Sequence, residues 1–258
     1  MNLAELRDFA LGLADHADRI SLAAFADPGR ADAKVDGSPV TAADRAVEQS
    51  LRERIADRWP GHALLGEEHG GAIAPDRPTW VLDPIDATKN FLRGVPVFAT
   101  LIALVVGGRA VVGVASAPAM GERWDAAAGL GARCNGRPVA VSAVADLSSA
   151  HVLHGGLEWF RRAALWDALG ALADAAWRTR GFGDFWMYLL VAGGMADVAV
   201  EADLRPWDVA ALECIVTEAG GRLTAFDGGP AIGSGEALAT NGLLHDELVA
   251  RLSGRDGA

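Results

Sequence analysis

Trp-Val-Leu-Asp-Pro-Ile-Asp-Ala-Thr-Lys-Asn-Phe, residues 80–91, ends an apolar run with two carboxylates that lie three residues apart. The hydroxyl of Thr88 follows two residues after the second carboxylate. Hard cations such as Mg²⁺ and Ca²⁺ bind oxygen ligands, and a turn over residues 83–86 can aim two carboxylates and a freed backbone carbonyl at one point. The stretch therefore predicts a hard-metal site where a short apolar strand ends.

Two other segments supply acids of the same kind. Glu67 and Glu68 follow a short apolar run, and Asp208 stands beside Trp207 far along the chain. No Lys or Arg lies between residues 80 and 88 to neutralise the acids there. Because crowded acids repel one another unless a cation lies among them, we expect one site assembled from three segments.

Each of these acids also has a simpler interpretation. Glu67 and Glu68, in a loop, could lie on the solvated surface. Asp83 and Asp86 can end a strand and cap a helix, and Asp208 stands where a helix begins. Asp44 belongs to Thr41-Ala42-Ala43-Asp44, which is close to a capping box. Capping does not exclude a role in a metal site, so the residues alone leave both interpretations open.

Composition limits the class of protein. The chain has 258 residues, 51% of them hydrophobic and 22% charged, which predicts one compact globular unit with two lobes. A net charge of −11 argues against a nucleic-acid surface. Charged residues near the N-terminus argue against a signal peptide, and no apolar stretch is long enough to cross a membrane. We therefore expect a soluble, cytoplasmic protein.

Several other chemistries lack the residues that they need. Cys134 and Cys214 are too few for a disulfide framework or a thiolate metal site. The histidines show no zinc-like spacing, and no glycine-rich phosphate loop follows a strand. An anionic substrate of this acidic chain would need a divalent cation to neutralise it, which agrees with the predicted metal site.

Hydrophobic periodicity and turn residues predict an α/β protein with a first lobe over 1–142 and a second over 143–258. A hairpin through Gly107-Gly108 and a turn at Asn135-Gly136 belong to the first lobe. Its expected elements are helices over 3–25 and from 41 to Pro60-Gly61, a loop over 27–39, and strands over 63–65, 79–82, 99–106 and 110–116. The second lobe is expected to hold helices over 160–173, 184–193, 208–219 and 246–252, and strands over 177–180, 196–200 and 238–240.

Three ordered segments together resemble a known family. Gly66-Glu67-Glu68, Asp83-Pro84-Ile85-Asp86-Ala87-Thr88 and Trp207-Asp208-Val209-Ala210-Ala211 are similar to the three signature segments of the inositol monophosphatase family. The resemblance also covers residues 34–44, 129–136 and 218–221, so it spans nearly the whole chain. Residues 88–91, 93–96, 183–185 and 240–247 look most like the bacterial histidinol-phosphatase branch of this family.

The resemblance implies a layered αβαβα sandwich of the inositol monophosphatase and fructose-1,6-bisphosphatase type, formed as a homodimer. It also implies Mg²⁺-dependent hydrolysis of a small phosphorylated alcohol, because two hard cations about 4 Å apart generate hydroxide and stabilise the leaving oxygen. Two or three ions would be held by Glu67, Asp83, Asp86, Asp208 and the carbonyl of Ile85.

Further roles carry over residue by residue from the resemblance. Thr88 and Asp44 would form a hydrogen-bonded pair that, with Glu67, orients and deprotonates a metal-bound water. The N–H groups of Ala87 and Thr88 would take the phosphate oxygens. Ala87 stands where the family usually has Gly, and Ala resists a positive φ. We therefore expect an ordinary backbone conformation at Ala87, with no loss of activity.

The substrate would be bound by Asp86, Ala87, Thr88, Asp184, Glu201 and Asp208. Glu201 and Asp184 match positions at the alcohol end of the substrate, and two acids there suit a cationic amine better than a neutral polyol. Asp184 also stands at a plausible helix start. The leading hypothesis is hydrolysis of L-histidinol phosphate to L-histidinol and phosphate, a step of histidine biosynthesis. The alternatives are an inositol-1-monophosphatase, a broader sugar-phosphate phosphatase, and a non-catalytic metal-binding protein.

Overall fold

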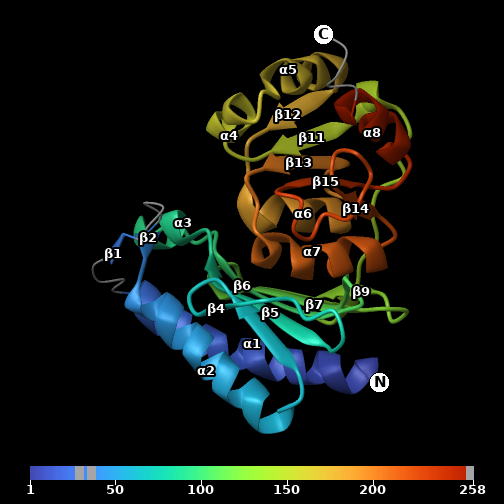
Figure 1. Cartoon of the computed structure of the whole chain (residues 1–258). Helices are drawn as coiled ribbons and strands as arrows, with labels where there is room; N and C mark the ends of the chain where they lie inside the picture. Colours follow the sequence, from blue (N-terminus) through green and yellow to red (C-terminus); the bar gives the residue numbers. More distant parts are fainter. Residues whose placement is uncertain (27–31, 34–38, 254–258) are drawn as a thin grey trace.

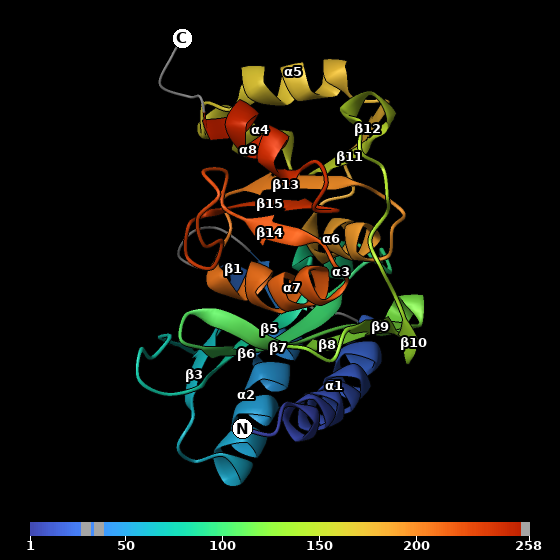
Figure 2. The same cartoon turned by 90° about the vertical axis from the view of Figure 1, so that its right-hand side faces the viewer.

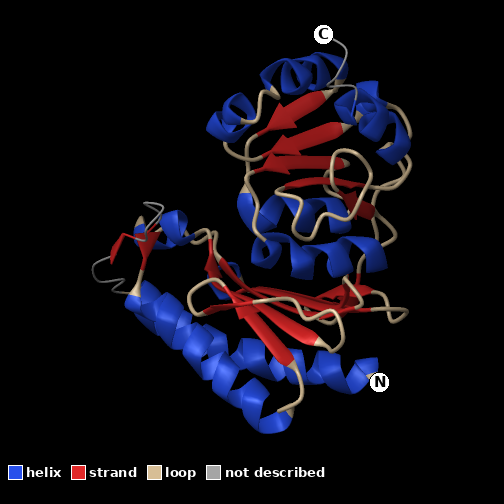
Figure 3. Ribbon diagram, in the orientation of Figure 1, coloured by secondary structure: helices blue, strands red, loops and turns tan. Residues whose placement is uncertain are grey.

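The computed structural model describes residues 1–26, 32–33 and 39–253, so most of the loop expected over 27–39 lies outside the described residues. The described elements stack in five layers (Figures 1 and 3). A helix pair, an eight-stranded sheet, a second helix pair, a five-stranded sheet and an outer group of helices follow one another. The expected αβαβα sandwich is confirmed.

The first layer consists of α1 (Leu3–Phe25) and α2 (Ala42–Arg58), which pack on one face of the large sheet (Figure 2). Leu6, Ala10 and Leu13 recur at helical spacing and are fully buried against the sheet. Thr41 caps α2, and the side chain of Asp44 accepts a hydrogen bond from the Thr41 N–H group in return. Both expected helices are confirmed.

The large sheet has the strand order β10-β9-β8-β7-β6-β5-β3-β4, and among its described strands only β3 and β5 pair in parallel. Almost every residue of β5 and β6 is buried, because helices cover both faces of the sheet. Gly107 and Gly108 have φ of 58° and 78°, as a two-residue hairpin turn requires. The strands are β3 (Ala63–Gly66), β4 (Gly70–Gly71), β5 (Thr79–Asp86), β6 (Ala99–Val106), β7 (Arg109–Ala117), β8 (Glu122–Ala127), β9 (Ala132–Cys134) and β10 (Arg137–Pro138).

The middle layer, α6 (Asp184–Ala192) and α7 (Pro206–Glu218), lies between the two sheets and is apolar on nearly all sides. The small sheet follows in the order β12-β11-β13-β15-β14. Its strands are β11 (His151–His154), β12 (Arg178–Arg180), β13 (Val198–Ala202), β14 (Arg222–Thr224) and β15 (Glu236–Thr240). The expected strands of this lobe are confirmed with ends shifted by one or two residues, whereas β11 and β14 were not expected.

The outer layer corrects one expectation. The single helix expected over 160–173 is wrong: the chain forms α4 (Leu157–Arg162) and α5 (Trp166–Ala175), beside α8 (His245–Ser253). The break lies at Ala164, whose φ is 56°, and it turns Leu165 into the core beneath these helices. Periodicity does not reveal the break, because the alanines around it fit a helix equally well.

The remaining short elements are β1 (Asp32–Ala33), β2 (Pro39–Val40), α3 (Thr88–Leu92), and two 3₁₀ turns at Pro118–Met120 and Leu147–Ser149. Among the described residues, no helix is both long and apolar enough to cross a membrane. All strands of the large sheet precede residue 142 and all strands of the small sheet follow it. One apolar core joins the two sheets through α6 and α7, so the division into two lobes stays a prediction.

Candidate active site

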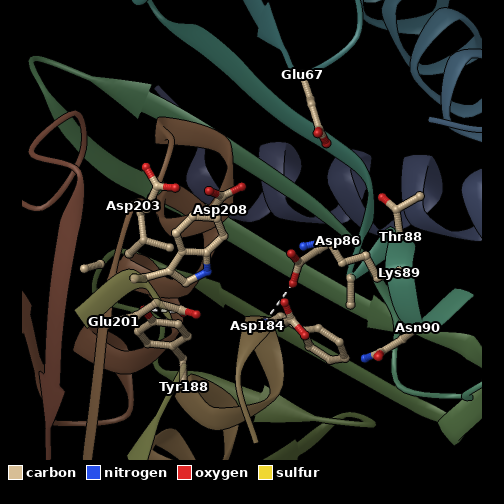
Figure 4. A pocket seen from close by; sticks show the side chains of 15 residues that line it. Glu67, Asp86, Thr88, Lys89, Asn90, Asp184, Tyr188, Glu201, Asp203 and Asp208 are labelled. Carbon is tan, nitrogen blue, oxygen red and sulfur yellow. Dashed lines mark hydrogen bonds between the residues drawn. The ribbon is translucent and has the colours of Figure 1, made fainter. Parts of the chain in front are cut away.

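A cavity of about 290 Å³ opens where β5 and α3 of the first half meet α6, β13 and α7 of the second. Glu67 points into it from one side, and Tyr188 and Glu201 lie on the opposite side, with Asp86 and Asp208 between them (Figure 4). The structure thus brings together seven residues that the sequence proposed for the site. They are Glu67, Asp86, Ala87, Thr88, Asp184, Glu201 and Asp208.

The end of β5 differs from the expected strand over 79–82. The strand continues to Asp86, and its pairing with β6 shifts register between Asp83 and Asp86. Pro84 lies in this shift and has no N–H group to donate, while its carbonyl accepts a hydrogen bond from Thr100 Oγ1 at 2.8 Å. The irregular pairing places both carboxylates of the segment near one point.

Three of the acids form a tight cluster. Ligand oxygens of Asp83, Asp86 and Asp208 all lie within 4.8 Å of one another. Asp208 caps α7 by accepting the Arg205 N–H group at 2.6 Å, so both of its expected uses are compatible. The Oδ1 atom of Asp83 is buried and has no hydrogen-bond partner among the described residues. An unpartnered buried carboxylate oxygen is costly, and the cluster is therefore incomplete without a further group.

Burial and the neighbouring acids disfavour the ionised forms of the carboxyl groups in the cluster. Burial, followed by the charges of Glu67 and Asp86, raises the pKa of Asp83 well above its usual range. Burial likewise raises the pKa of Asp208 to about 7. A hard divalent cation among these oxygens would favour the ionised forms and give Asp83 Oδ1 a partner, so the donor set fits Mg²⁺.

Thr88 lies beside the cluster on the first turn of α3. Its Oγ1 donates to the carbonyl of Ile85 at 3.0 Å, and Asp44 Oδ1 lies 3.5 Å away as a second acceptor. Burial raises the pKa of Asp44, although its hydrogen bonds from Thr41 oppose that rise. The hydroxyl has a single proton, so in this geometry it donates its hydrogen bond to the nearer acceptor, the carbonyl of Ile85.

Ala87 contradicts the expectation of an ordinary backbone. Its φ and ψ are 66° and 44°, the left-handed conformation that Ala resists. Its carbonyl accepts hydrogen bonds from the N–H groups of Asn90 and Phe91, and its side chain packs on a cluster that includes Phe91 and Phe98. These contacts on both sides hold Ala87 in a conformation that costs about 1–2 kcal/mol.

Replacing Ala87 by glycine is expected to stabilise the protein by about 1 kcal/mol, because glycine adopts a positive φ without this strain. For a chain of this size that corresponds to a rise of about 2 °C in Tm. Thermal unfolding followed by circular dichroism measures the change. A lower Tm would show that the contacts of the Ala87 methyl group outweigh its backbone strain.

Acids also surround the far end of the cavity. Glu201 on β13 is 7% exposed and accepts a hydrogen bond from Tyr188 Oη at 3.1 Å. Burial, followed by the charge of Asp184, raises the pKa of Glu201 to about 8. Burial also raises the pKa of Asp184, and the charge of Lys89 opposes that rise. A cation bound beside these two acids would favour their ionised forms.

One hydrogen bond links the two ends of the cavity. The N–H group of Phe185, at the start of α6, donates to Asp86 Oδ2 at 2.8 Å (Figure 4). Asp184, which precedes it, has a φ of 49° and is the first residue of α6. The acid expected to hold metal therefore also fixes the helix that carries Asp184 and Tyr188.

Sequence reasoning missed several lining residues: Lys89, Asn90, Trp159, Phe185, Tyr188, Ala202, Asp203 and Leu204. Tyr188 had a readable signal, because it lies four residues after Asp184 and so on the same face of the predicted helix. Trp159 lies on α4, far from the recognised motifs, and nothing in its sequence context indicates the cavity.

Comparisons with known proteins show which proteins this chain resembles. The chain is 48% identical over 250 residues to a histidinol-phosphatase of Mycobacterium tuberculosis, covering 95% of this chain and 96% of that one. It is 44% identical to a histidinol-phosphatase of Streptomyces coelicolor, with 94% and 95% covered. A solved inositol monophosphatase of Anabaena (Nostoc) sp. PCC 7120 matches with a TM-score of 0.86 and 33% identity over 98% of this chain and 97% of that one.

The sequence model of the inositol monophosphatase family matches residues 2–255. The relatives that cover nearly the whole chain carry the names of phosphatases. This protein is therefore a phosphatase, a hydrolase of phosphoric monoesters, and the chain belongs to the inositol monophosphatase family.

Proposed function

We propose that this protein is a Mg²⁺-dependent phosphatase that hydrolyses L-histidinol phosphate to L-histidinol and phosphate. The observation that best supports this substrate is a pair of acids, Asp184 and Glu201, which faces the acidic cluster across one cavity. A substrate with an anionic phosphate and a cationic amine matches these two ends. The relatives named histidinol-phosphatase in Mycobacterium tuberculosis and Streptomyces coelicolor support the same choice.

Mg²⁺ would be held by Glu67, Asp83, Asp86, Asp208 and the carbonyl of Ile85, which together could take two or three ions. The unpartnered Oδ1 of Asp83 supports this assignment. When bound, the ions would neutralise the phosphate and lower the pKa of water, so that hydroxide is available for in-line attack. The protein would supply the oxygen ligands for that chemistry.

The chain's own groups would orient the attacking water and the phosphate. Thr88 Oγ1 would accept a hydrogen bond from the water. For this, the Thr88 hydroxyl would rotate, so that it donates its own hydrogen bond to Asp44 Oδ1 in place of the carbonyl of Ile85. Glu67 would accept the proton that the water loses on attack, and this proton would pass to the alcohol oxygen when its bond to phosphorus breaks. The left-handed turn at Ala87 leads into α3, and the N–H groups of Ala87 and Thr88 bind the phosphate oxygens.

The alcohol end would be recognised by charge. An ammonium group that enters between Asp184 and Glu201 favours their ionised forms, so Glu201, with its pKa of about 8, gives up its proton on binding. The hydroxyl of Tyr188 then donates to the carboxylate and fixes its orientation. A neutral polyol offers no charge to drive this change.

The substrate is tested by comparing kcat/KM for L-histidinol phosphate and inositol 1-phosphate, in the wild type and in Glu201→Gln. The wild type is expected to prefer histidinol phosphate, and the variant to lose about 30-fold or more on that substrate alone, because a buried ion pair loses one partner. Glu53→Gln, an exposed position on α2, is the matched control. Turnover of inositol phosphate without turnover of histidinol phosphate would overturn the proposal.

An inositol-1-monophosphatase or a broader sugar-phosphate phosphatase is the second candidate. The structural similarity to the inositol monophosphatase of Anabaena favours it, because that protein shares the fold over nearly its whole length. In that case Glu201→Gln would lower the activity on both substrates to a similar extent. The same measurements therefore separate the two candidates.

The proposed metal site has a consequence for pH. The pKa values of Asp208 and Glu201 rise from 3.8 and 4.5 to about 7 and about 8 in the metal-free fold, so the folded state binds more protons than the unfolded state between these limits. Their contribution to stability is therefore present at low pH and is lost as pH rises through the folded-state values. Mg²⁺ is expected to raise Tm more at about pH 8 than at about pH 5. An equal rise at both values would contradict the assigned ligands.

The proposed enzyme acts in the cytoplasm as a homodimer, without a nucleic-acid or membrane partner. The net charge of −11 supports the absence of a nucleic-acid partner. Light scattering of the purified protein measures the mass in solution and tests the dimer directly.

A further inference from the structure

Glu48 is a fully buried acid of α2 that belongs to no motif singled out above. Its side chain is 0% exposed, yet three donors surround the carboxylate. The N–H group of Glu68 donates to Oε2 at 2.6 Å, and the N–H group of His69 donates to Oε1 at 3.1 Å. The third donor is Nη1 of Arg52, at 3.1 Å from Oε1. A buried carboxylate with this set of donors is satisfied and fixed in place.

The turn after β3 closes around this carboxylate. A Cβ atom on Gly66 would lie 2.1 Å from Glu48 Oε1, so the backbone approaches the carboxylate as closely as only glycine allows. Nη1 of Arg52 also donates to the carbonyl of Gly70 at 3.2 Å. The side chains of Glu48 and Arg52 thereby hold both ends of the turn that connects β3 to β4.

Glu67 is the residue that this arrangement fixes. Its own N–H group donates to the carbonyl of Leu82 on β5 at 3.2 Å, and the N–H groups of the next two residues donate to Glu48. Its backbone is thus held from the sheet on one side and from α2 on the other. The side chain of Glu67 is left to point into the cavity toward Asp86 and Asp208 (Figure 4).

Asp44 precedes Glu48 by one turn of α2, so the two acids share a face of the helix. Asp44 approaches Thr88 and Glu48 fixes the turn that carries Glu67. We propose that Glu48 is a positioning residue, which sets the place of Glu67 and makes α2 the common support of both water-orienting groups. This inference rests on the proposed function, because Glu67 has its role only there.

Glu48→Gln tests the proposal. Glutamine keeps the size of the side chain but turns an NH₂ group toward N–H donors that now lack an acceptor. The expected result is a Kd for Mg²⁺ that rises by about 10–100-fold in isothermal titration calorimetry, with a matching loss of kcat for L-histidinol phosphate and little change in KM. Glu53→Gln makes the same chemical change on an exposed part of α2 and is expected to leave all three quantities unchanged.

Gly66→Ala is a second variant that displaces the carboxylate from the side of β3, and it is expected to reproduce the same loss of Mg²⁺ affinity. If only one of the two variants folds, that variant is sufficient for the test. A merely structural role would lower Tm but leave the Mg²⁺ affinity and kcat of the folded variant unchanged, and that result would overturn the inference. If the wild type itself neither binds Mg²⁺ nor releases phosphate, the proposed function fails and this inference fails with it.

Discussion

Replacing Asp86 by asparagine is expected to lower kcat/KM for L-histidinol phosphate on the order of 1,000-fold. Removal of groups that only support metal ligands lowers activity by about 10–100-fold, and Asp86 is proposed to be a ligand itself, so a larger loss is expected. Asparagine keeps the shape and can still accept the hydrogen bond from Phe185 through its amide oxygen. The loss would therefore report on charge rather than on misplacement of α6. Steady-state phosphate release at saturating Mg²⁺ measures it.

The same substitution is expected to stabilise the metal-free protein. Burial, followed by the charges of Asp184 and Asp208, raises the pKa of Asp86, so its ionised form is unfavourable without a bound cation. A neutral amide removes that cost, and Tm in EDTA at about pH 8 should rise. Asp174→Asn, on an exposed part of α5, is the control for both measurements. Unchanged phosphate release in the Asp86 variant would instead favour a non-catalytic metal-binding protein.

Chelation of the metal is expected to abolish activity completely while most of the fold remains. The site lies at the surface of a cavity, whereas three large apolar clusters hold the layers together without any of its acids. Burial of apolar side chains dominates the stability of a domain of this size. EDTA should therefore stop phosphate release and leave the far-UV circular dichroism spectrum nearly unchanged.

Added Mg²⁺ should restore the activity of the chelated enzyme, which separates loss of the ion from irreversible damage. Ca²⁺ at the same concentration is the useful comparison, because it binds oxygen ligands with looser geometry and does not meet the demands of Mg²⁺ chemistry. Collapse of the circular dichroism signal on chelation would contradict the prediction, since it would make the ions part of the folding energy.

Much of the fold could be predicted because its local signals agree with its tertiary structure. The apolar spacing of α1, the capping box at Thr41 and the Gly107-Gly108 turn each determine an element by local chemistry. The short strand β11 lacks such a signal, because its pairing partners β12 and β13 are distant in sequence. The strand β14 spans only three residues and pairs with the next strand, β15, across the segment 225–235. Their strand character depends on contacts that a local pattern does not contain.

The site divides in the same way. The acids of β5 could be identified as site residues because Glu67 and Asp208 were considered with them. Strand ends and helix caps alone do not explain acids in all three segments. The conformation of Ala87 could not be foreseen, because its intrinsic preference is overridden by the hydrogen bonds and packing on both sides. Glu48 was missed for a related reason: on the helix it is one acid among several, and only the folded turn shows its three donors.

The residues proposed for hydrolysis and those proposed for substrate recognition lie in different segments of the chain, which affects how relatives can diverge. The residues proposed to bind water and phosphate lie within 44–88, whereas the proposed alcohol end of the cavity is lined by a separate segment over 184–204. In the proposed enzyme, substitutions of side chains such as Asp184 and Glu201 would alter which alcohol is accepted, whereas the N–H group of Phe185 that donates to Asp86 belongs to the backbone and would remain. New substrates could therefore arise by exchange of single side chains within 184–204, while the residues proposed for hydrolysis stay the same.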